Sequence, residues 1–260
     1  MEELLVYRSV EISYNGIPAV RDINFTLKSG EILGIVGESG SGKSSLIRGA
    51  LGILGQGGLV TQGEILYRDR NLPDLTEKEL RKIRGAQIGM IFQDAGAALC
   101  PVRTIGSQIF ESLSAHRKIT RKESDTEALE LFARLGFREG ERILAGYPFE
   151  LSGGMNQRVG IAMAMLLKPE ILLADEPTSA LDVSVQRQAV EELLLTRELY
   201  GTAMVLVTHN LGVVRAMADT VLVLKAGEAV EYGPAPQVLG HPRENYTKEL
   251  LAAVPVLEKN

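Results

Sequence analysis

The segment from Gly37 to Ser44 reads GESGSGKS and matches the pattern G-x-x-x-x-G-K-[ST]. An apolar strand is expected before it and a helix after it, a setting in which such a loop wraps its backbone N–H groups around a phosphate. Lys43 is then placed to reach the β- and γ-phosphates of a nucleotide, and the Ser44 hydroxyl to ligate Mg²⁺. The predicted nucleotide-binding residues of this segment are Gly37, Glu38, Ser39, Gly40, Ser41, Gly42, Lys43, Ser44 and Ser45.

Two adjacent carboxylates, Asp175 and Glu176, follow the apolar run ILLA. A strand this apolar belongs in the middle of a sheet, so its last residues reach the carboxyl edge, where open α/β folds bind ligands. Asp175 can hold Mg²⁺ there, directly or through water. Glu176 can polarise an attacking water as a general base. Taken alone, the two acids could equally cap a turn, but beside the glycine loop they favour a catalytic site.

The apolar pattern predicts the elements that position these groups. Buried strands are expected from Glu31 to Val36 and in the runs PEILLADEP and AMVLVTHN. Helices are expected from Lys43 to Leu51 and in the run VSVQRQAVEELLLTRELYG, which Gly201 closes. Apolar strands that alternate with helices predict a parallel sheet covered on both faces.

Two other parts of the chain have a different pattern. In the first thirty or so residues, short apolar runs are separated by Asn15-Gly16 and Ser29-Gly30, which predicts antiparallel strands joined by tight turns. From Thr104 to Leu135 the apolar residues recur at helical spacing, within a block that runs from about Pro101 to Gln157. This block is therefore expected to be a helical subdomain.

Residues 151–158 read LSGGMNQR and resemble the signature of the ATP-binding cassette (ABC) ATPases, which is close to L-S-G-G-Q. Four further features resemble this family's adenine-stacking aromatic, Q-loop glutamine, D-loop and switch histidine, in that order: Tyr14, Gln93, Ser179–Asp182 and His209. Tyr14 and His209, taken singly, would more often be a half-buried strand tyrosine and a strand-end histidine. The complete set in the family's order identifies the chain as a member.

The resemblance implies an α/β fold: a P-loop NTPase ABC cassette with a RecA-like core, an antiparallel β subdomain and a helical signature subdomain. Residues 1–260 are expected to form a single ABC ATPase domain. Within it, the predicted parts are the nucleotide-binding core with the β subdomain (1–92 and 158–240), the Q-loop and helical subdomain (about 93–157) and a C-terminal tail (241–260).

The resemblance also implies ATP hydrolysis, with ATP and Mg²⁺ bound. Family members dimerise head-to-tail, and each ATP lies between the glycine loop of one cassette and the Ser152–Gly154 stretch of the other. Glu176 would act as general base, His209 would hold the γ-phosphate, and Lys43 would complete the catalytic set. The further implied ATP contacts are Tyr14, Gln93, Ser152, Gly153, Gly154 and Asp182, and the implied Mg²⁺ ligands are Ser44, Gln93 and Asp175.

Composition narrows the functional class. The net charge is −5, which argues against nucleic acid as the main partner, and the only cysteine, Cys100, excludes a disulfide within the chain. We find no signal peptide and no apolar run that could span a bilayer. Among the classes of ABC ATPases, a stand-alone cassette such as this one resembles the importers, which implies the motor subunit of a bacterial importer, peripheral on the cytoplasmic face of the membrane. A soluble ABC ATPase acting on nucleic acid or ribosomes is the alternative.

The implied partners of such a motor are two transmembrane permease subunits, a second ABC ATPase chain of the same or a sibling kind and, indirectly, an extracytoplasmic solute-binding protein. The tail HPRENYTKELL and the segment FQDAGAALCP resemble the dipeptide, oligopeptide and nickel uptake subfamily. The short tail and the YPFE of residues 147–150 resemble the nickel and metal-chelate branch of this subfamily more than its peptide branch, so nickel or a metal chelate is the cargo that the resemblance implies. Di- or oligopeptide uptake is the alternative.

Overall fold

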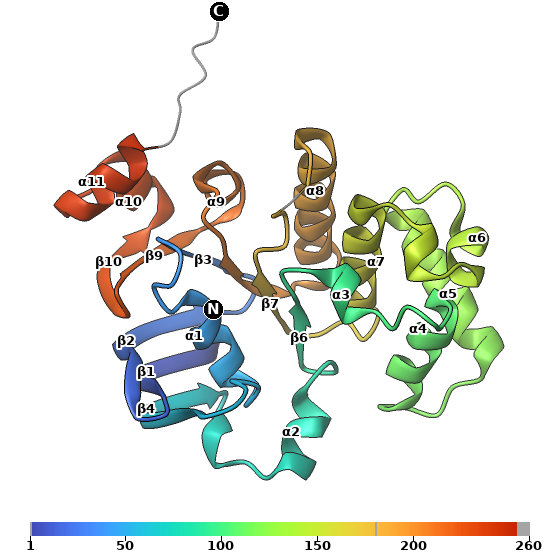
Figure 1. The fold of residues 1–260 in the computed structure, drawn as a ribbon, viewed down its shortest axis with the longest axis horizontal. Helices are drawn as coiled ribbons and strands as arrows, with labels where there is room; N and C mark the ends of the chain where they lie inside the picture. The colour runs from blue at the N-terminus through green and yellow to red at the C-terminus, as the bar shows by residue number, and fades with distance from the viewer. Residues whose placement is uncertain (1, 180, 254–260) are drawn as a thin grey trace, which may run out of the picture. The chain divides into compact units, whose positions relative to one another are not determined.

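The computed structural model describes residues 2–179 and 181–253 (Figure 1). The chain forms two compact units: unit 1 comprises Met1–Leu80 and Ala203–Asn260, and unit 2 comprises Arg81–Thr202. Ala180 of the predicted D-loop and residues 254–260 of the predicted tail lie outside the described residues. Each unit is described by itself below.

Unit 1 contains an antiparallel sheet in the order β2-β1-β4-β5. Asn15 and Gly16 have φ values of 50° and 80°, the left-handed pair that a two-residue hairpin turn requires. This turn joins β1 and β2, so the antiparallel strands predicted near the N-terminus are confirmed. The strands are β1 (Glu3–Tyr14), β2 (Ile17–Lys28), β4 (Gly58–Tyr67) and β5 (Arg70–Asn71).

Unit 1 also contributes four strands to a second sheet, in the order β10-β9-β3-β8. β3 pairs in parallel with both β8 and β9, which confirms the predicted parallel arrangement, whereas β10 pairs antiparallel with β9. The sequence analysis did not predict the β9–β10 hairpin, because β10 is mostly exposed and lacks an apolar pattern. The strands are β3 (Ile32–Gly37), β8 (Ala203–Val207), β9 (Thr220–Lys225) and β10 (Glu228–Pro234).

The helices of unit 1 cover these strands. Leu211 and Val214 of α9, Val238 of α10 and Tyr246 of α11 share one apolar cluster with Val36 of β3. The C-terminal helices therefore belong to the core beside the glycine loop and are coloured red in Figure 1. The helices are α1 (Lys43–Ala50), the short 3-10 turn Leu72–Asp74, α9 (Leu211–Met217), α10 (Ala235–Gly240) and α11 (Asn245–Ala252); α2 (Glu77–Ile83) runs on into unit 2.

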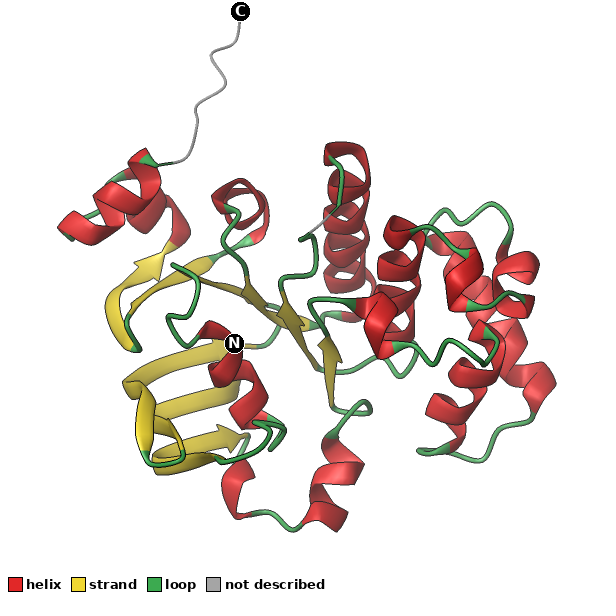
Figure 2. Cartoon of the chain, viewed as in Figure 1, coloured by secondary structure: helices red, strands yellow, loops and turns green. Residues whose placement is uncertain are grey.

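Unit 2 is mostly helical and has two parallel strands, β6 (Ile88–Ile91) and β7 (Ile171–Asp175) (Figure 2). Its helices confirm the change to helical spacing after Thr104. The C-cap of α8 is Gly201 with φ 66°, as predicted. The helices are α3 (Ala95–Ala98), α4 (Ile105–Ser114), α5 (Arg121–Arg134), α6 (Gly140–Ala145), the 3-10 turn Pro148–Glu150, α7 (Gly153–Met165) and α8 (Val183–Tyr200).

A buried ion pair joins α7 to α8. The Arg158 guanidinium donates to a Glu192 carboxylate oxygen, and both side chains are less than a tenth exposed. Arg158 also donates to the Leu135 carbonyl at 2.7 Å and lies 4.1 Å from the centre of the Phe137 ring. These contacts fix the helix that begins at the LSGG stretch.

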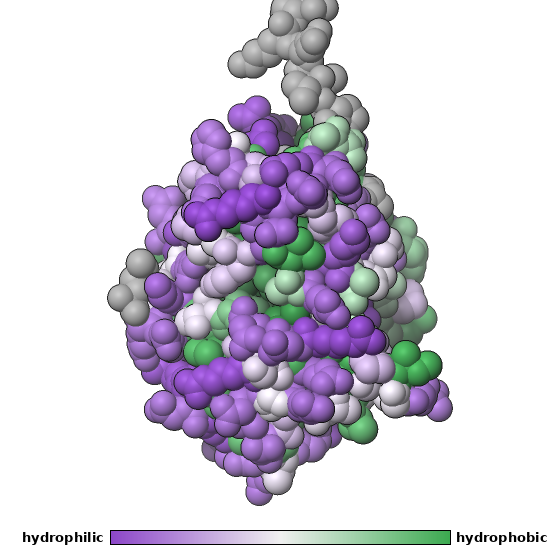
Figure 3. Space-filling model, turned by 90° about the vertical axis from the view of Figure 1, so that its left-hand side faces the viewer, coloured by the Kyte–Doolittle hydropathy of each residue, from purple (hydrophilic) through white to green (hydrophobic). Residues whose placement is uncertain are grey.

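The molecular surface is mainly polar on the face shown in Figure 3, where the hydrophobic side chains form small separate groups. Among the helices in residues 2–179 and 181–253, none is both long enough and apolar enough to cross a membrane.

Candidate functional site

The glycine loop connects β3 to α1, as its spacing predicted. A Cβ atom on Gly37 would lie 2.1 Å from the Leu224 carbonyl oxygen, and one on Gly42 would lie 2.8 Å from the Ala19 carbonyl oxygen. Both glycines also have positive φ values, 152° and 95°. The backbone therefore takes a path that other residues cannot follow.

Lys43 folds back onto this loop. Its ammonium donates to the carbonyl oxygens of Gly37 at 2.9 Å and Glu38 at 2.7 Å, and the residue is only 7% exposed. The buried Ser41 hydroxyl has no hydrogen-bond partner among the described residues. The first N–H groups of α1 lack intrahelical acceptors, and the positive end of the helix dipole adds to them. A lysine and an unpartnered hydroxyl at the N-terminal end of a helix suit an anion such as phosphate.

The structure brings Tyr14 to the same loop. Tyr14 is the last residue of β1, and its hydroxyl lies 3.1 Å from the Ser45 hydroxyl, in the first turn of α1. The ring is partly exposed. An aromatic ring beside a phosphate loop is positioned to stack on a base.

His209 reaches the same sheet edge as the glycine loop. β8 is parallel to β3, with Val207 level with Ile35. His209 and Gly37 each lie two residues further on, so adjacent strands deliver them to one edge. His209 is exposed, and Asn210 next to it caps α9 by accepting from the Gly212 N–H at 2.9 Å.

In unit 2, two parallel strands likewise end at one sheet edge, where Gln93 and the acidic pair Asp175 and Glu176 follow them. Ile91 of β6 is level with Ala174 of β7, so Gln93 and Glu176 leave their strands at the same edge. Gln93 is exposed, whereas Asp175 is fully buried and Glu176 is 9% exposed. Glu176 has φ 49°, a strained value for a residue other than glycine, and its carbonyl accepts from the Ser179 N–H and hydroxyl at 3.1 and 2.9 Å. Such strain is common in functional turns.

Ser152 and Asp182 each cap a helix. The exposed Ser152 hydroxyl accepts from the Met155 N–H at 3.2 Å at the start of α7. The Asp182 carboxylate accepts from the N–H groups of Ser184 and Val185 at 3.0 Å at the start of α8. The Ser184 hydroxyl and these N–H groups hold the pKa of Asp182 below its usual range. The LSGG stretch therefore opens a helix, as expected.

The sequence analysis missed Gln157, a buried bridge in unit 2. Its side chain donates to the Pro177 carbonyl at 2.8 Å and accepts from the Ala95 N–H at 3.2 Å. It joins α7 to α3, which follows Gln93, and to the turn after Glu176. The sequence offered only a weak signal, because Gln157 stands between two other polar residues, Asn156 and Arg158.

The predicted site residues thus fall into two groups. Tyr14, Gly37–Ser45 and His209 belong to unit 1, and Gln93, Ser152–Gly154, Asp175, Glu176 and Asp182 belong to unit 2. No group of three or more His, Cys, Asp or Glu side chains suited to a metal occurs in the described parts of the chain. The oxygens of Ser44, Gln93 and Asp175 are nevertheless the hard donors that Mg²⁺ prefers.

A family model described as "ABC transporter" matches residues 20–179. The chain belongs to this family. It is an ABC-type ATPase that binds ATP, as the resemblance of its motifs implied.

Several relatives of this ABC protein are similar over almost its whole length. The dipeptide transport ATP-binding protein DppD of Bacillus subtilis is 42% identical over 100% of this chain and 79% of its own. The oligopeptide transport ATP-binding protein OppD of Haemophilus influenzae is 43% identical over 94% of this chain and 75% of its own. These names support the peptide alternative of the cargo prediction and give no support to nickel.

Two solved structures confirm the cassette fold. The cbiO1 protein of Clostridium perfringens, described as part of the ABC transporter complex cbiONQ, has a TM-score of 0.80 and 26% identity over 93% of this chain and 92% of its own. The ATP-binding cassette MJ0796, in a dimeric post-hydrolysis state with ADP and Pi, has a TM-score of 0.77 and 32% identity over 89% of this chain and 98% of its own.

Proposed function

We propose that this ABC ATPase is the motor subunit of a bacterial importer that takes up dipeptides or oligopeptides. The observation that carries this proposal is the extent of the similarity to peptide transport ATP-binding proteins, which includes the C-terminal tail. The prediction of nickel depended on residues 147–150 and on the short tail, and peptide uptake replaces it as the better supported cargo.

The proposed roles follow the two groups of site residues. The loop Gly37–Ser45 holds the phosphates, and Lys43 moves from its carbonyl partners to the β- and γ-phosphates, which are stronger acceptors. Tyr14 stacks on adenine. Mg²⁺ held by Ser44, Gln93 and Asp175 would neutralise developing charge on the phosphates.

Glu176 and His209 are the proposed catalytic side chains beside Lys43. Glu176 takes a proton from the attacking water, and its buried turn holds the carboxylate at the strand edge. His209 donates to the γ-phosphate. Parallel strands carry each of them to a carboxyl edge, where ligands of α/β folds bind.

We propose that the second half of each ATP site comes from another cassette. A Cβ on Gly154 would lie 2.9 Å from Val185 of α8, so that glycine serves packing within the chain. A Cβ on Gly153 would meet nothing within 4 Å. A glycine with open space around it is explained when a second subunit approaches it closely, with Ser152 and Asp182 alongside. The second subunit is the same chain or a sibling.

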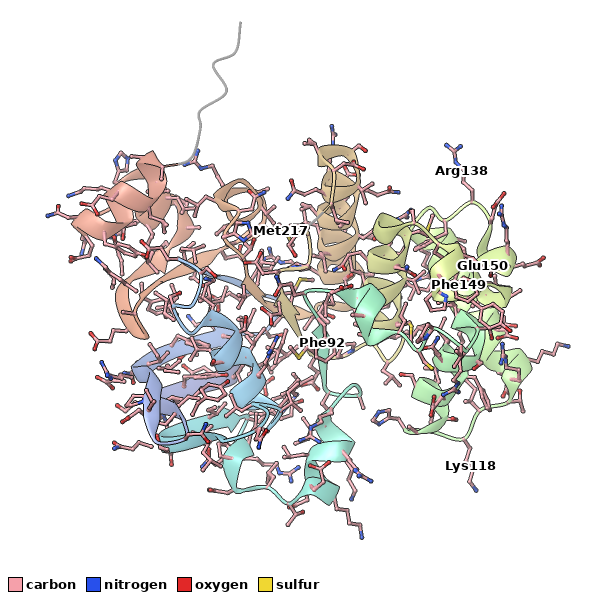
Figure 4. The ribbon with its side chains drawn as sticks, in the orientation of Figure 1. Phe92, Lys118, Arg138, Phe149, Glu150 and Met217 are labelled. Atoms are coloured by element: carbon pink, nitrogen blue, oxygen red, sulfur yellow. The ribbon has the colours of Figure 1, made fainter. Side chains whose placement is uncertain are left out.

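The transmembrane partners are proposed to dock on unit 2 near Gln93–Thr104. Phe92, just before this segment, is 41% exposed, and Val102, within it, is 78% exposed. Phe149, before α7, is 71% exposed (Figure 4). Docking of a partner would bury these apolar side chains. The protein would then lie on the cytoplasmic face of the membrane, and an extracytoplasmic binding protein would select the cargo.

Uptake by intact cells tests this function. In the source bacterium, we expect Glu176→Gln to abolish uptake of a labelled dipeptide and to leave uptake of radioactive nickel unchanged. Glu191→Gln, which changes an exposed carboxylate paired with Arg187, is the control and should transport normally. Loss of nickel uptake alone would restore the metal prediction. Unchanged uptake of nickel, of the dipeptide and of a labelled oligopeptide would overturn the proposed function.

A further inference from the structure

The C-terminal helix α11 packs directly behind the glycine loop. Tyr246, in its first turn, is 8% exposed and belongs to the apolar cluster that contains Val36, the residue before Gly37. Leu250, one turn further along α11, packs against the same cluster. α11 therefore packs against the end of β3 from which the glycine loop starts, and so supports the loop.

The Tyr246 hydroxyl contacts the loop backbone itself. It accepts a hydrogen bond from the Glu38 N–H at 3.4 Å. The carbonyl of the same peptide group, Gly37 O, accepts from the Lys43 ammonium at 2.9 Å. Because the N–H and C=O of a trans peptide point in opposite directions, Tyr246 and Lys43 hold this one peptide plane from its two sides.

The tyrosine is fixed by contacts that do not involve its hydroxyl. The Lys225 ammonium lies 4.5 Å from the centre of the ring. The Glu231 carboxylate accepts from the N–H groups of Arg243 and Glu244 at 2.9 and 3.3 Å and so holds the start of α11. Removal of the hydroxyl alone should therefore leave the ring and helix in place.

We propose that Tyr246 is a positioning residue for ATP binding, which holds the Gly37–Glu38 peptide in its orientation when Lys43 leaves Gly37 for a phosphate. The inference rests on the proposed role of the loop as the phosphate site. Lys43 exchanges one acceptor for another during binding, whereas the contact from Tyr246 persists. The loop then keeps its shape when ATP binds. No free energy is lost in reordering the loop, a loss that would weaken binding.

The test is Tyr246→Phe in the full chain, with equilibrium binding of a fluorescent ATP analogue and steady-state hydrolysis as readouts. We expect Kd and KM for ATP to rise about three- to tenfold, which is the range of one modest hydrogen bond, while kcat stays unchanged. The melting temperature of the nucleotide-free protein, in which Lys43 still holds the Gly37–Glu38 peptide, should fall no further than that of the control. Backbone amide exchange in the peptide that contains Glu38 should become faster. Tyr232→Phe is the control, because its hydroxyl likewise makes one hydrogen bond, to the Thr26 carbonyl at 3.3 Å, and it should leave Kd, KM and kcat unchanged.

Lys43→Ala, measured in parallel, distinguishes a failure of the proposed role of Tyr246 from a failure of the proposed phosphate site. If it loses ATP binding while Tyr246→Phe binds and exchanges like the wild type, the loop is the phosphate site and Tyr246 is not a positioning residue. If Lys43→Ala binds ATP normally, the assignment of the loop itself fails. A Tyr246→Phe protein with a lower melting temperature and a proportional loss of kcat would show a merely structural role and would also overturn the inference.

Discussion

At the scale of single residues, the backbone of Glu176 forms a sharp turn at the end of β7. The residue follows the last position of β7, and its left-handed φ of 49° ends the strand abruptly. Two hydrogen bonds from Ser179 to the Glu176 carbonyl hold this turn. The strain at Glu176 is consistent with a side chain whose direction matters for its function.

For Glu176→Gln, we expect ATP binding to remain and turnover to fall about 100-fold or more, because an amide cannot take a proton from water. The substitution keeps the size of the side chain, so the turn should remain intact. The measurement is phosphate release at saturating ATP together with binding of labelled ATP. Glu191→Gln is the matched surface control. Hydrolysis near the wild-type rate would remove Glu176 from the catalytic role.

Glu192 gives a prediction on pH. Burial raises the pKa of Glu192 to about 7, more than the Arg158 charge lowers it, whereas the unfolded chain titrates near 4.5. The folded protein therefore keeps this proton over a range in which the unfolded chain has lost it, so stability is greatest below the unfolded pKa and declines as pH rises through the folded pKa.

We expect the unfolding free energy of the wild type to fall, relative to Glu192→Gln, by on the order of 2–3 kcal/mol between pH 4.5 and 7. Urea unfolding of both proteins at a series of pH values measures this difference, in which the titration of all other groups cancels. Parallel pH dependences would show that Glu192 is already ionised in the folded protein and that the ion pair outweighs burial.

At the scale of elements, α7 connects the LSGG stretch at its start to other predicted site residues of unit 2. Gln157 ties it to α3 and to the turn after Glu176 through buried hydrogen bonds to Ala95 and Pro177. A shift of α7 therefore moves the peptide groups next to two predicted site residues, Gln93 and Glu176. This is a physical connection, within unit 2, between the signature and the acidic pair.

For Gln157→Leu, we expect a loss of about 2–4 kcal/mol in stability, because a buried N–H and a buried carbonyl lose their partners. We also expect a lower rate of ATP hydrolysis, since the turn after Glu176 is loosened. Gln108→Leu is the matched control: this buried glutamine holds Cys100 and Arg103 through three hydrogen bonds and makes none to the turn after Glu176. The control should be destabilised with normal hydrolysis, and equal rates in both variants would contradict the connection.

Much of this arrangement was predictable from local signals. The Asn15-Gly16 turn, the glycine loop between strand and helix and the Gly201 cap each encode their own conformation in adjacent residues. The β9–β10 hairpin, the Gln157 bridge and the contact of Tyr246 with Glu38 were missed. The hairpin was missed because β10 is mostly exposed and lacks an apolar pattern. The contacts of Gln157 and Tyr246 depend on partners distant in the sequence, and a polar residue in a sequence does not reveal which backbone group it will meet.

At the scale of the whole molecule, the central expectation is an ATP-dependent pair of cassettes. Hydrolysis would normally dissolve this pair, so Glu176→Gln with ATP should convert monomers into dimers in sedimentation velocity. Substitutions at Gly153 and Gly154 then distinguish a glycine needed at the interface between two subunits from a glycine needed for packing within one chain. An alanine at 154 would press against Val185, whereas an alanine at 153 meets open space within its own chain.

We therefore expect Gly153→Ala, added to Glu176→Gln, to keep the melting temperature and the ATP affinity of the monomer while it prevents dimers from forming. Alanine is a better helix former than glycine, so the start of α7 gains rather than loses stability, and a missing dimer cannot be attributed to unfolding. Gly154→Ala should instead lower the melting temperature without ATP. A Gly153→Ala protein that dimerises like its parent would show that the LSGG stretch does not face the neighbouring nucleotide, and a parent that stays monomeric at every protein concentration would remove the paired-cassette mechanism.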